Sequence, residues 1–207
     1  MKPKVVMILS SWSSGSSAVS GFLHKSGVDL FGPYFRAALD VKTPNTYESN
    51  DFRALMMHSI DEWSFEYKVS RNEFLELFQQ FINQKLSNTN FSSEILLGLK
   101  HPLSVFWLKE ICELIEPVFV VVTRPFEKIE ATRVRRSWHE VYGSKGAKTI
   151  YGHIYTFLQE NGHTFFAISY EDFLASAEKR IKLLEFCDIT VDLDQAEVAF
   201  QEVINRA

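Results

Sequence analysis

The chain has 207 residues, which fits one large domain and is long enough to bury a core without disulfides or metals. Its formal net charge of −4 excludes the surplus of Lys and Arg typical of a general nucleic-acid binder, so any bound anion needs a local site. The apolar share is 46%, and no apolar run is long enough to cross a membrane. The two cysteines lack metal-type spacing. We therefore expect a cytoplasmic protein with no membrane span and no metal.

The first half of the chain begins with a strand pattern and a helix pattern. Residues 4–9 are a short apolar run that enters a Ser/Gly cluster, as a buried parallel strand entering a turn does. Apolar residues then recur at helical spacing up to Gly27, a natural helix stop. Residues 28–50 look irregular, residues 51–61 have helical character, and residues 73–86 form a clear amphipathic helix.

The second half repeats this alternation. Residues 118–122 are five consecutive apolar residues, the pattern of a strand buried on both faces. The further elements that we expect are strands at 94–99 and 164–168, helices at 104–115, 126–141 and 150–158, a surface turn at 143–146, and helices beyond 169. Alternating strands and helices predict an α/β fold, with three αβα layers around a central parallel sheet.

Ligands of such sheets bind where the strands end, and the first strand ends at a loop rich in serine. Residues 10–17 read Ser-Ser-Trp-Ser-Ser-Gly-Ser-Ser. A turn from strand to helix points several N–H groups at one spot, which favours phosphate or sulfate. The spacing is similar to an ATPase phosphate loop, but serines stand at Ser10 and Ser16 in place of its first Gly and its Lys. An anion site and a turn that merely caps a helix both fit this loop.

A second group of donors follows the strand at 118–122. Arg124 stands at the strand end, and residues 128, 132 and 136 are Lys, Thr and Arg, each four positions further along one helix face. Arg is well shaped for bidentate contact with phosphate. We interpret Arg124 and Thr132 as functional, and Lys128 and Arg136 as ordinary charges of a solvated face.

Together these motifs resemble the sulfotransferases that use 3′-phosphoadenylyl sulfate. Residues 10–17 resemble the family's 5′-phosphosulfate loop, and residues 123–125 with Thr132 resemble its 3′-phosphate motif. Residues 45–48, 100–102 and 169–173 are similar to elements of a bacterial branch. The resemblance spans residues 4–189. It implies a fold like that of P-loop nucleoside triphosphate hydrolases, with a helical insertion after the first βα unit.

The same resemblance implies a single sulfotransferase-like domain over residues 1–207, with residues 31–93 as an acceptor-binding or lid insertion. It implies in-line transfer of a sulfuryl group from 3′-phosphoadenylyl sulfate to a hydroxyl or amine of a small-molecule or carbohydrate acceptor. The residues expected to bind this cofactor are Ser13, Ser14, Gly15, Ser16, Ser17, Arg124 and Thr132. Lys100 is expected as a cation near the transferring group, and Glu48 as general base ahead of His58 and His101.

Ser13 departs from the family, which carries Arg or Lys at this position. The loss of one preorganised donor of this kind typically costs ~10²–10³ in rate. Three alternatives therefore stay open: a nucleotide-binding homologue with impaired catalysis, a small-molecule kinase with a divergent phosphate loop, and an interaction module. A set of aromatic residues either lines an acceptor surface or belongs to the core: Phe31, Tyr34, Phe35, Tyr47, Phe52 and Trp63.

Overall fold

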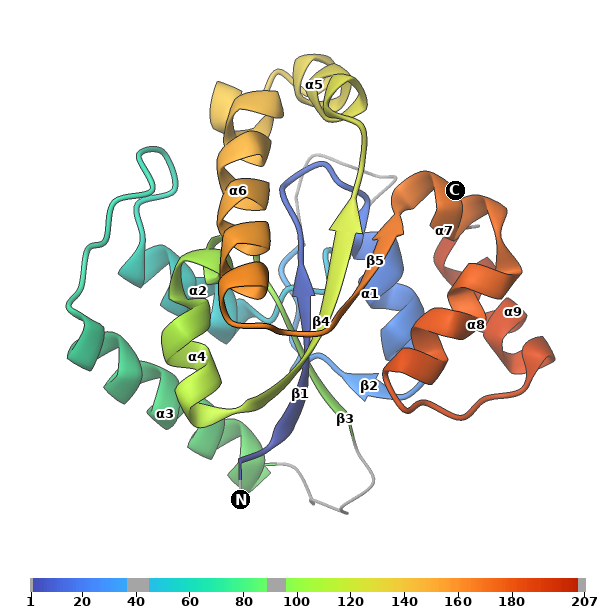
Figure 1. Cartoon of the computed structure of the whole chain (residues 1–207), viewed down its shortest axis with the longest axis horizontal. Helices are drawn as coiled ribbons and strands as arrows, with labels where there is room; N and C mark the ends of the chain where they lie inside the picture. The colour runs from blue at the N-terminus through green and yellow to red at the C-terminus, as the bar shows by residue number, and fades with distance from the viewer. Residues whose placement is uncertain (1, 37–44, 89–95, 205–207) are drawn as a thin grey trace.

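The computed structural model describes residues 2–36, 45–88 and 96–204 (Figure 1). Within these residues five strands form one parallel sheet in the order β2-β3-β1-β4-β5. The strands are β1 (Lys4–Leu9), β2 (Val28–Asp29), β3 (Leu96–Lys100), β4 (Glu116–Thr123) and β5 (Phe165–Ser169). Helices flank the sheet on both sides, so the predicted α/β fold with a central parallel sheet is confirmed.

The sheet separates two apolar cores because alternate residues of β1 point to opposite faces. Val5 and Met7 belong to one core, whereas Val6 and Ile8 belong to the other. The first core packs against α2 (Asn50–Ser59), α3 (Arg71–Asn88), the 3₁₀ segment Pro102–Trp107, α4 (Leu108–Leu114) and α6 (Ser144–Glu160). The second packs against α1 (Ser16–Lys25), α7 (Tyr170–Ala175), α8 (Ala177–Phe186) and α9 (Leu193–Ile204).

Two of the predicted elements are wrong. Residues 126–141 are not one helix: α5 (Phe126–Arg135) ends, Ser137 takes a positive φ of 51°, and the short 3₁₀ segment Glu140–Tyr142 follows. The Trp138 amide closes the helix end by donating to the carbonyl of Arg133 at 3.1 Å. Residues 143–146 are not a surface turn either, since α6 begins at Ser144, whose amide donates to the Glu130 carboxylate at 2.8 Å.

The described part of residues 31–93 contributes to the core. β2 lies just before this segment, in a stretch that the sequence pattern left irregular, and α2 and α3 form the crossover from β2 to its neighbour β3. Phe31, Tyr47 and Phe52 are at most 3% exposed, so the core alternative holds for these three. Trp63 is 50% exposed and remains available at the surface.

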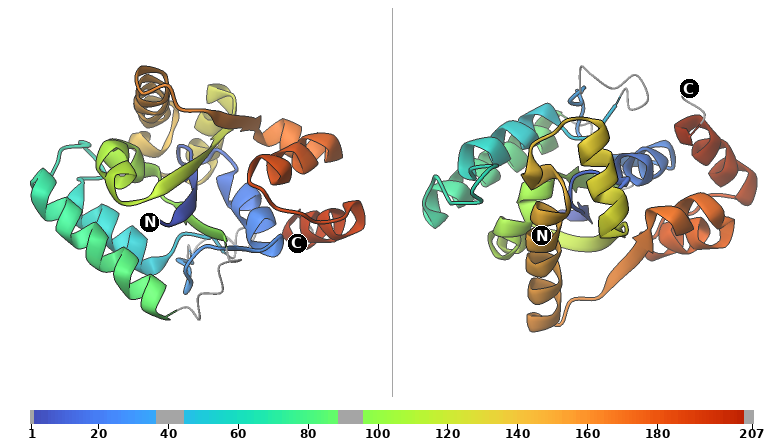
Figure 2. Two further views of the ribbon diagram at one scale, coloured as in Figure 1. Left: turned by 60° about the horizontal axis from the view of Figure 1, so that its bottom comes forward. Right: turned by 90° about the horizontal axis from the view of Figure 1, so that it is seen from above.

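The carboxyl ends of the strands, where the sequence predicts the site, lie together at one end of the sheet, which Figure 2 (right) views from above. β1 pairs with β3 on one side and with β4 on the other, and the register aligns Ile8 with Lys100 and Leu9 with Val121. The loop after β1 therefore lies between the ends of β3 and β4. Among the helices that the structure describes, none combines the length and the apolar character needed to cross a membrane.

Candidate anion-binding site

The loop between β1 and α1 forms the centre of the candidate site. Two of its residues, Ser13 and Gly15, have positive φ angles of 60° and 83°. A β-carbon at Gly15 would overlap the ring of Tyr170, so this position requires glycine both for its backbone conformation and for the close contact. In the described part of the chain, the amides of residues 13–17 make no backbone hydrogen bond, and α1 has no side-chain cap. Unpaired amides at a helix N-terminus are suited to bind an anion.

The serine side chains of the loop are mostly buried. Ser14 is fully buried, and its hydroxyl has no hydrogen-bond partner in the described structure. The Ser16 side chain lies in the first turn of α1 and is 6% exposed, and the Ser13 hydroxyl lies 3.5 Å from the carbonyl oxygen of Tyr142. Buried hydroxyls nearly always have a partner, so the unpaired Ser14 hydroxyl is an unusual feature of the loop, but it has no accessible surface for a ligand.

Arg124 lies directly against the loop, as the parallel sheet predicts. Its Nη1 donates to the carbonyl oxygen of Ser13 at 3.1 Å and to the Thr132 hydroxyl at 3.2 Å. Thr132 in turn donates to the Lys128 carbonyl, one turn back in α5. The guanidinium also lies over the ring of Tyr170, 5.2 Å from its centroid. The structure therefore brings Arg124 and Thr132 together with the loop.

Sequence reasoning missed a carboxylate beside Arg124. Glu171 Oε1 lies 3.1 Å from the Lys128 ammonium and 3.6 Å from Arg124 Nε. Burial raises the pKa of Glu171, but the hydrogen bond from Lys128 and the charge of Arg124 outweigh it and hold this pKa below its usual value. The Glu171 carboxylate thus competes with any anion that approaches Arg124. Its partners come from another strand end, so no local sequence pattern could have revealed the contact.

On the other side of the loop, Lys100 and Glu48 form a buried ion pair. The Lys100 ammonium, at the end of β3, donates to Glu48 Oε1 at 2.9 Å, to the Thr46 carbonyl at 2.8 Å and to the Ser17 hydroxyl at 3.2 Å. These three acceptors match the three protons of a lysine ammonium. Lys100 and Glu48 are 3% and 8% exposed. The two residues predicted to be catalytic thus lie beside the loop, but their charges pair with each other.

The electrostatics of this pair disfavour Glu48 as a proton acceptor. Burial alone raises the pKa of Glu48, but the ammonium of Lys100 outweighs this effect and holds the pKa below its usual value. His101, a second candidate base, is buried, accepts a hydrogen bond from the Leu103 amide through Nδ1, and has its pKa lowered by burial to about 4. His58 lies in the last turn of α2 and is exposed.

Neither protein-family models nor curated proteins match this chain in sequence. A function for this chain must therefore be inferred from the geometry of the site. Its distinguishing features are a loop with unpaired amides, a guanidinium hydrogen-bonded to one end of that loop, and an ammonium hydrogen-bonded to the other end.

Proposed function

We propose that this protein is a sulfotransferase that uses 3′-phosphoadenylyl sulfate, built on a fold of the P-loop nucleoside triphosphate hydrolase kind. One observation carries the proposal. The unpaired amides of residues 13–17 adjoin Arg124, which is bonded to the Ser13 carbonyl, whereas Lys100 at the other end of the loop is already paired with Glu48. A nucleotide with anionic groups at two separated positions matches this arrangement better than one with a single phosphate chain.

The residues present fit the two anionic groups of this cofactor. In the proposal, the amides of residues 13–17 hold the 5′-phosphosulfate, at the positive end of the α1 dipole. Arg124 and Thr132 hold the 3′-phosphate, which distinguishes this cofactor from ordinary nucleotides. When bound, the cofactor supplies an activated sulfuryl group.

The protein's own contribution would be positioning and charge stabilisation, as in phosphoryl transfer. The acceptor oxygen forms a bond to sulfur, the bond from sulfur to the phosphate oxygen breaks, and adenosine 3′,5′-bisphosphate leaves. Lys100 fixes Ser17 and the backbone at Thr46 through its hydrogen bonds. Because its pKa is lowered, Glu48 is better suited to hold Lys100 in place than to accept the proton of the acceptor.

A second candidate function is a nucleotide-binding homologue with impaired catalysis. Ser13 supplies no positive charge to the loop, and its hydroxyl faces the Tyr142 carbonyl at 3.5 Å. The two cations nearest the loop are each accompanied by a carboxylate, Lys100 by Glu48 and Arg124 by Glu171. Under this alternative the site binds the bisphosphate but transfers no sulfuryl group.

The test is calorimetry with adenosine 3′,5′-bisphosphate and adenosine 5′-phosphate, on the wild type and on Arg124→Ala. A charge-assisted hydrogen bond contributes about 1.5–3 kcal/mol, so we expect Arg124→Ala to weaken the bisphosphate roughly 10- to 100-fold. The 5′-phosphate should be almost unaffected. Arg135→Ala, at an exposed arginine in the last turn of α5, is the matched control and should change neither affinity.

The other outcomes separate the alternatives. Equal losses for both ligands would refute the assignment of Arg124 to the 3′-phosphate. Binding without sulfate transfer to any acceptor class would favour the impaired homologue. Preference for ATP with Mg²⁺ over the bisphosphate would favour a kinase, and binding of neither nucleotide would overturn the proposal in favour of an interaction module.

A further inference from the structure

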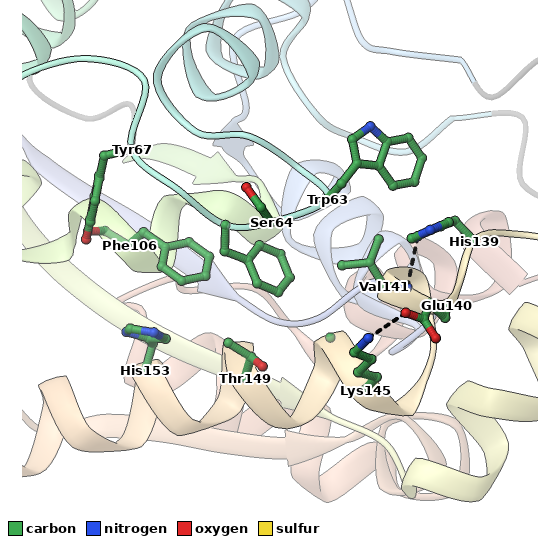
Figure 3. A pocket seen from close by; sticks show the side chains of 12 residues that line it. Trp63, Ser64, Tyr67, Phe106, His139, Glu140, Val141, Lys145, Thr149 and His153 are labelled. Atoms are coloured by element: carbon green, nitrogen blue, oxygen red, sulfur yellow. Dashed lines mark hydrogen bonds and ion pairs between the residues drawn. The ribbon is translucent and has the colours of Figure 1, made fainter.

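A second candidate site is a cleft of about 470 Å³ beside the loop (Figure 3). It lies between residues 63–67, the 3₁₀ segment Pro102–Trp107 and the first half of α6. Its volume falls in the range of roughly 300–1,000 Å³ that is typical of small-molecule sites. Figure 3 shows Lys145, Thr149 and His153 projecting from α6 toward the segment that carries Ser64 and Tyr67.

The wall of this cleft is continuous with the anion-binding loop. Trp12, a loop residue, stacks on Phe65 with ring centroids 6.2 Å apart and an interplanar angle of 11°. Phe65 stacks in turn on Phe106 at 5.1 Å, and both of these rings line the cleft. The edge of Tyr142 meets Trp12 at 4.8 Å, next to the contact of Ser13 with the Tyr142 carbonyl. A molecule in the cleft therefore lies beside the loop that would present the sulfuryl group.

The aromatic rings of the cleft are exposed but held in place. Trp63 and Tyr67 are 50% and 56% exposed, which is unusual for such large rings. The Tyr67 hydroxyl donates to the Phe106 carbonyl at 2.9 Å, and its ring meets Trp107 edge-on at 4.7 Å. Trp63 is in edge contact with His139 at 4.5 Å. Exposed rings with fixed positions offer a preorganised surface for a ligand with a flat apolar face.

The polar groups of the cleft indicate a neutral ligand. Of the described residues that line it, the fully charged ones are Glu140 and Lys145, which pair with each other at 2.5 Å. Burial lowers the pKa of His153, so this ring is neutral at pH 7 and offers one donor and one acceptor. Thr149 adds a hydroxyl from the same face of α6. The pair offers a charged ligand no unpaired counter-ion, whereas Thr149 and His153 offer hydrogen bonds to a neutral polar one.

We propose that this cleft binds a neutral sugar unit of the acceptor. The apolar face of the sugar ring packs on the exposed aromatic rings, and its hydroxyls bond to Thr149 and His153. This assignment rests on the proposed function and names its substrate class. The hydroxyl that projects toward Ser13 is then the one that gains the sulfuryl group: its oxygen bonds to sulfur, adenosine 3′,5′-bisphosphate departs with the electrons of the broken bond, and the hydroxyl proton passes to water.

The test measures binding of sugars to the full chain without nucleotide, by saturation-transfer NMR. The probes are methyl glucoside, methyl galactoside, glucuronate and 4-nitrophenol. We expect at least one of the neutral glycosides to bind, and Trp63→Ala or Tyr67→Ala to weaken that binding about five- to tenfold. Both residues are about half exposed, so these variants should fold. Phe126→Ala removes a ring that is 38% exposed on α5 outside the cleft, and as the matched control it should leave binding unchanged.

A charge variant sharpens the test. Glu140→Gln removes the partner of Lys145, so glucuronate should bind this variant more tightly than it binds the wild type. Binding of 4-nitrophenol with neither glycoside would overturn the inference, as would glycoside binding that survives both aromatic substitutions. Failure here is separable from failure of the proposed function, because adenosine 3′,5′-bisphosphate binding is measured independently on the same samples. Bisphosphate binding without glycoside binding refutes only the sugar assignment.

Discussion

Substitution of Lys100 by methionine tests whether the buried pair organises the loop. Met has nearly the length of Lys but no charge, so Lys100→Met leaves the Glu48 carboxylate, 8% exposed, without its partner. The Ser17 hydroxyl and the Thr46 carbonyl lose a donor at the same time. Breaking a buried ion pair by removing one partner typically costs about 3–5 kcal/mol, and we expect a loss of that size in the free energy of unfolding.

The double variant Lys100→Met/Glu48→Gln separates charge from packing. If the loss comes from an uncompensated carboxylate, removing its charge should recover about half of it, and the two substitutions should be clearly non-additive. The matched control is the exposed helix pair of Lys182 and Glu178, where Lys182→Met should cost less than about 0.5 kcal/mol.

Urea unfolding at pH 7, followed by circular dichroism and tryptophan fluorescence, measures Lys100→Met, Glu48→Gln, their combination, Lys182→Met and the wild type. The pH dependence gives a second check. Because the pKa of Glu48 is lower in the folded state than its ordinary value of 4.5, the stabilisation from its ionisation is present above pH 4.5 and is lost as the pH falls through the folded-state pKa. A loss below about 1 kcal/mol for Lys100→Met, or no recovery in the double variant, would refute the reasoning.

Three further predictions follow from the same region. In the folded state the pKa of His101 is about 4, whereas in the unfolded chain this histidine binds a proton below about pH 6.5. The free energy of unfolding of the wild type should therefore fall by about 2 kcal/mol between pH 7 and pH 5, and His101→Asn should not show this fall. Urea titrations that give the same pH dependence for both proteins would contradict this. Glu171→Gln removes the carboxylate beside Arg124 and should raise affinity for adenosine 3′,5′-bisphosphate about two- to fivefold in calorimetry, whereas unchanged or weaker binding would argue against competition. Gly15→Ala should lower the free energy of unfolding by about 1–3 kcal/mol more than Gly27→Ala, measured in urea. Both glycines have a positive φ, but only at Gly15 would the added β-carbon overlap a side chain, that of Tyr170. Similar losses for the two variants would show that the close contact is unimportant.

The sequence predicted the parts of the fold that depend on local pattern. The apolar runs of β1 and β4 and the polar residues that follow them were sufficient to place the loop and Arg124 at one edge of a parallel sheet. The helix predicted over 126–141 failed because its apolar period continues past the point where Ser137 takes a positive φ. Periodicity does not detect such a local break, and neither did it detect the two-residue strand β2.

Long-range pairing lay outside what the sequence could predict. Lys100 and Glu48 were each expected near the reacting group, but no contact between them was predicted. That contact joins positions 52 residues apart in the sequence. The cleft was missed for a related reason. Lys145 and Gly146 were assigned to a surface turn, and only the start of α6 at Ser144 places them opposite residues 63–67. In both cases the candidate site depends on which segments face each other, and the composition of each segment carries no such information.

The two cationic ends of the loop differ in how they can respond to a bound anion. At one end, the ion pair of Lys100 and Glu48 is buried and makes all three of its ammonium hydrogen bonds, so its geometry is fixed before any ligand arrives. At the other end, the Glu171 side chain is 35% exposed and can rotate toward water, leaving Arg124 for another anion. A bound anion could therefore replace the Glu171 carboxylate at Arg124, whereas the hydrogen bonds of Lys100 keep the other end of the loop in one position. A ligand that differs only at its 3′ position would be recognised where the protein can exchange charges at low cost, because displacing a carboxylate into water avoids leaving any charge buried and unpaired.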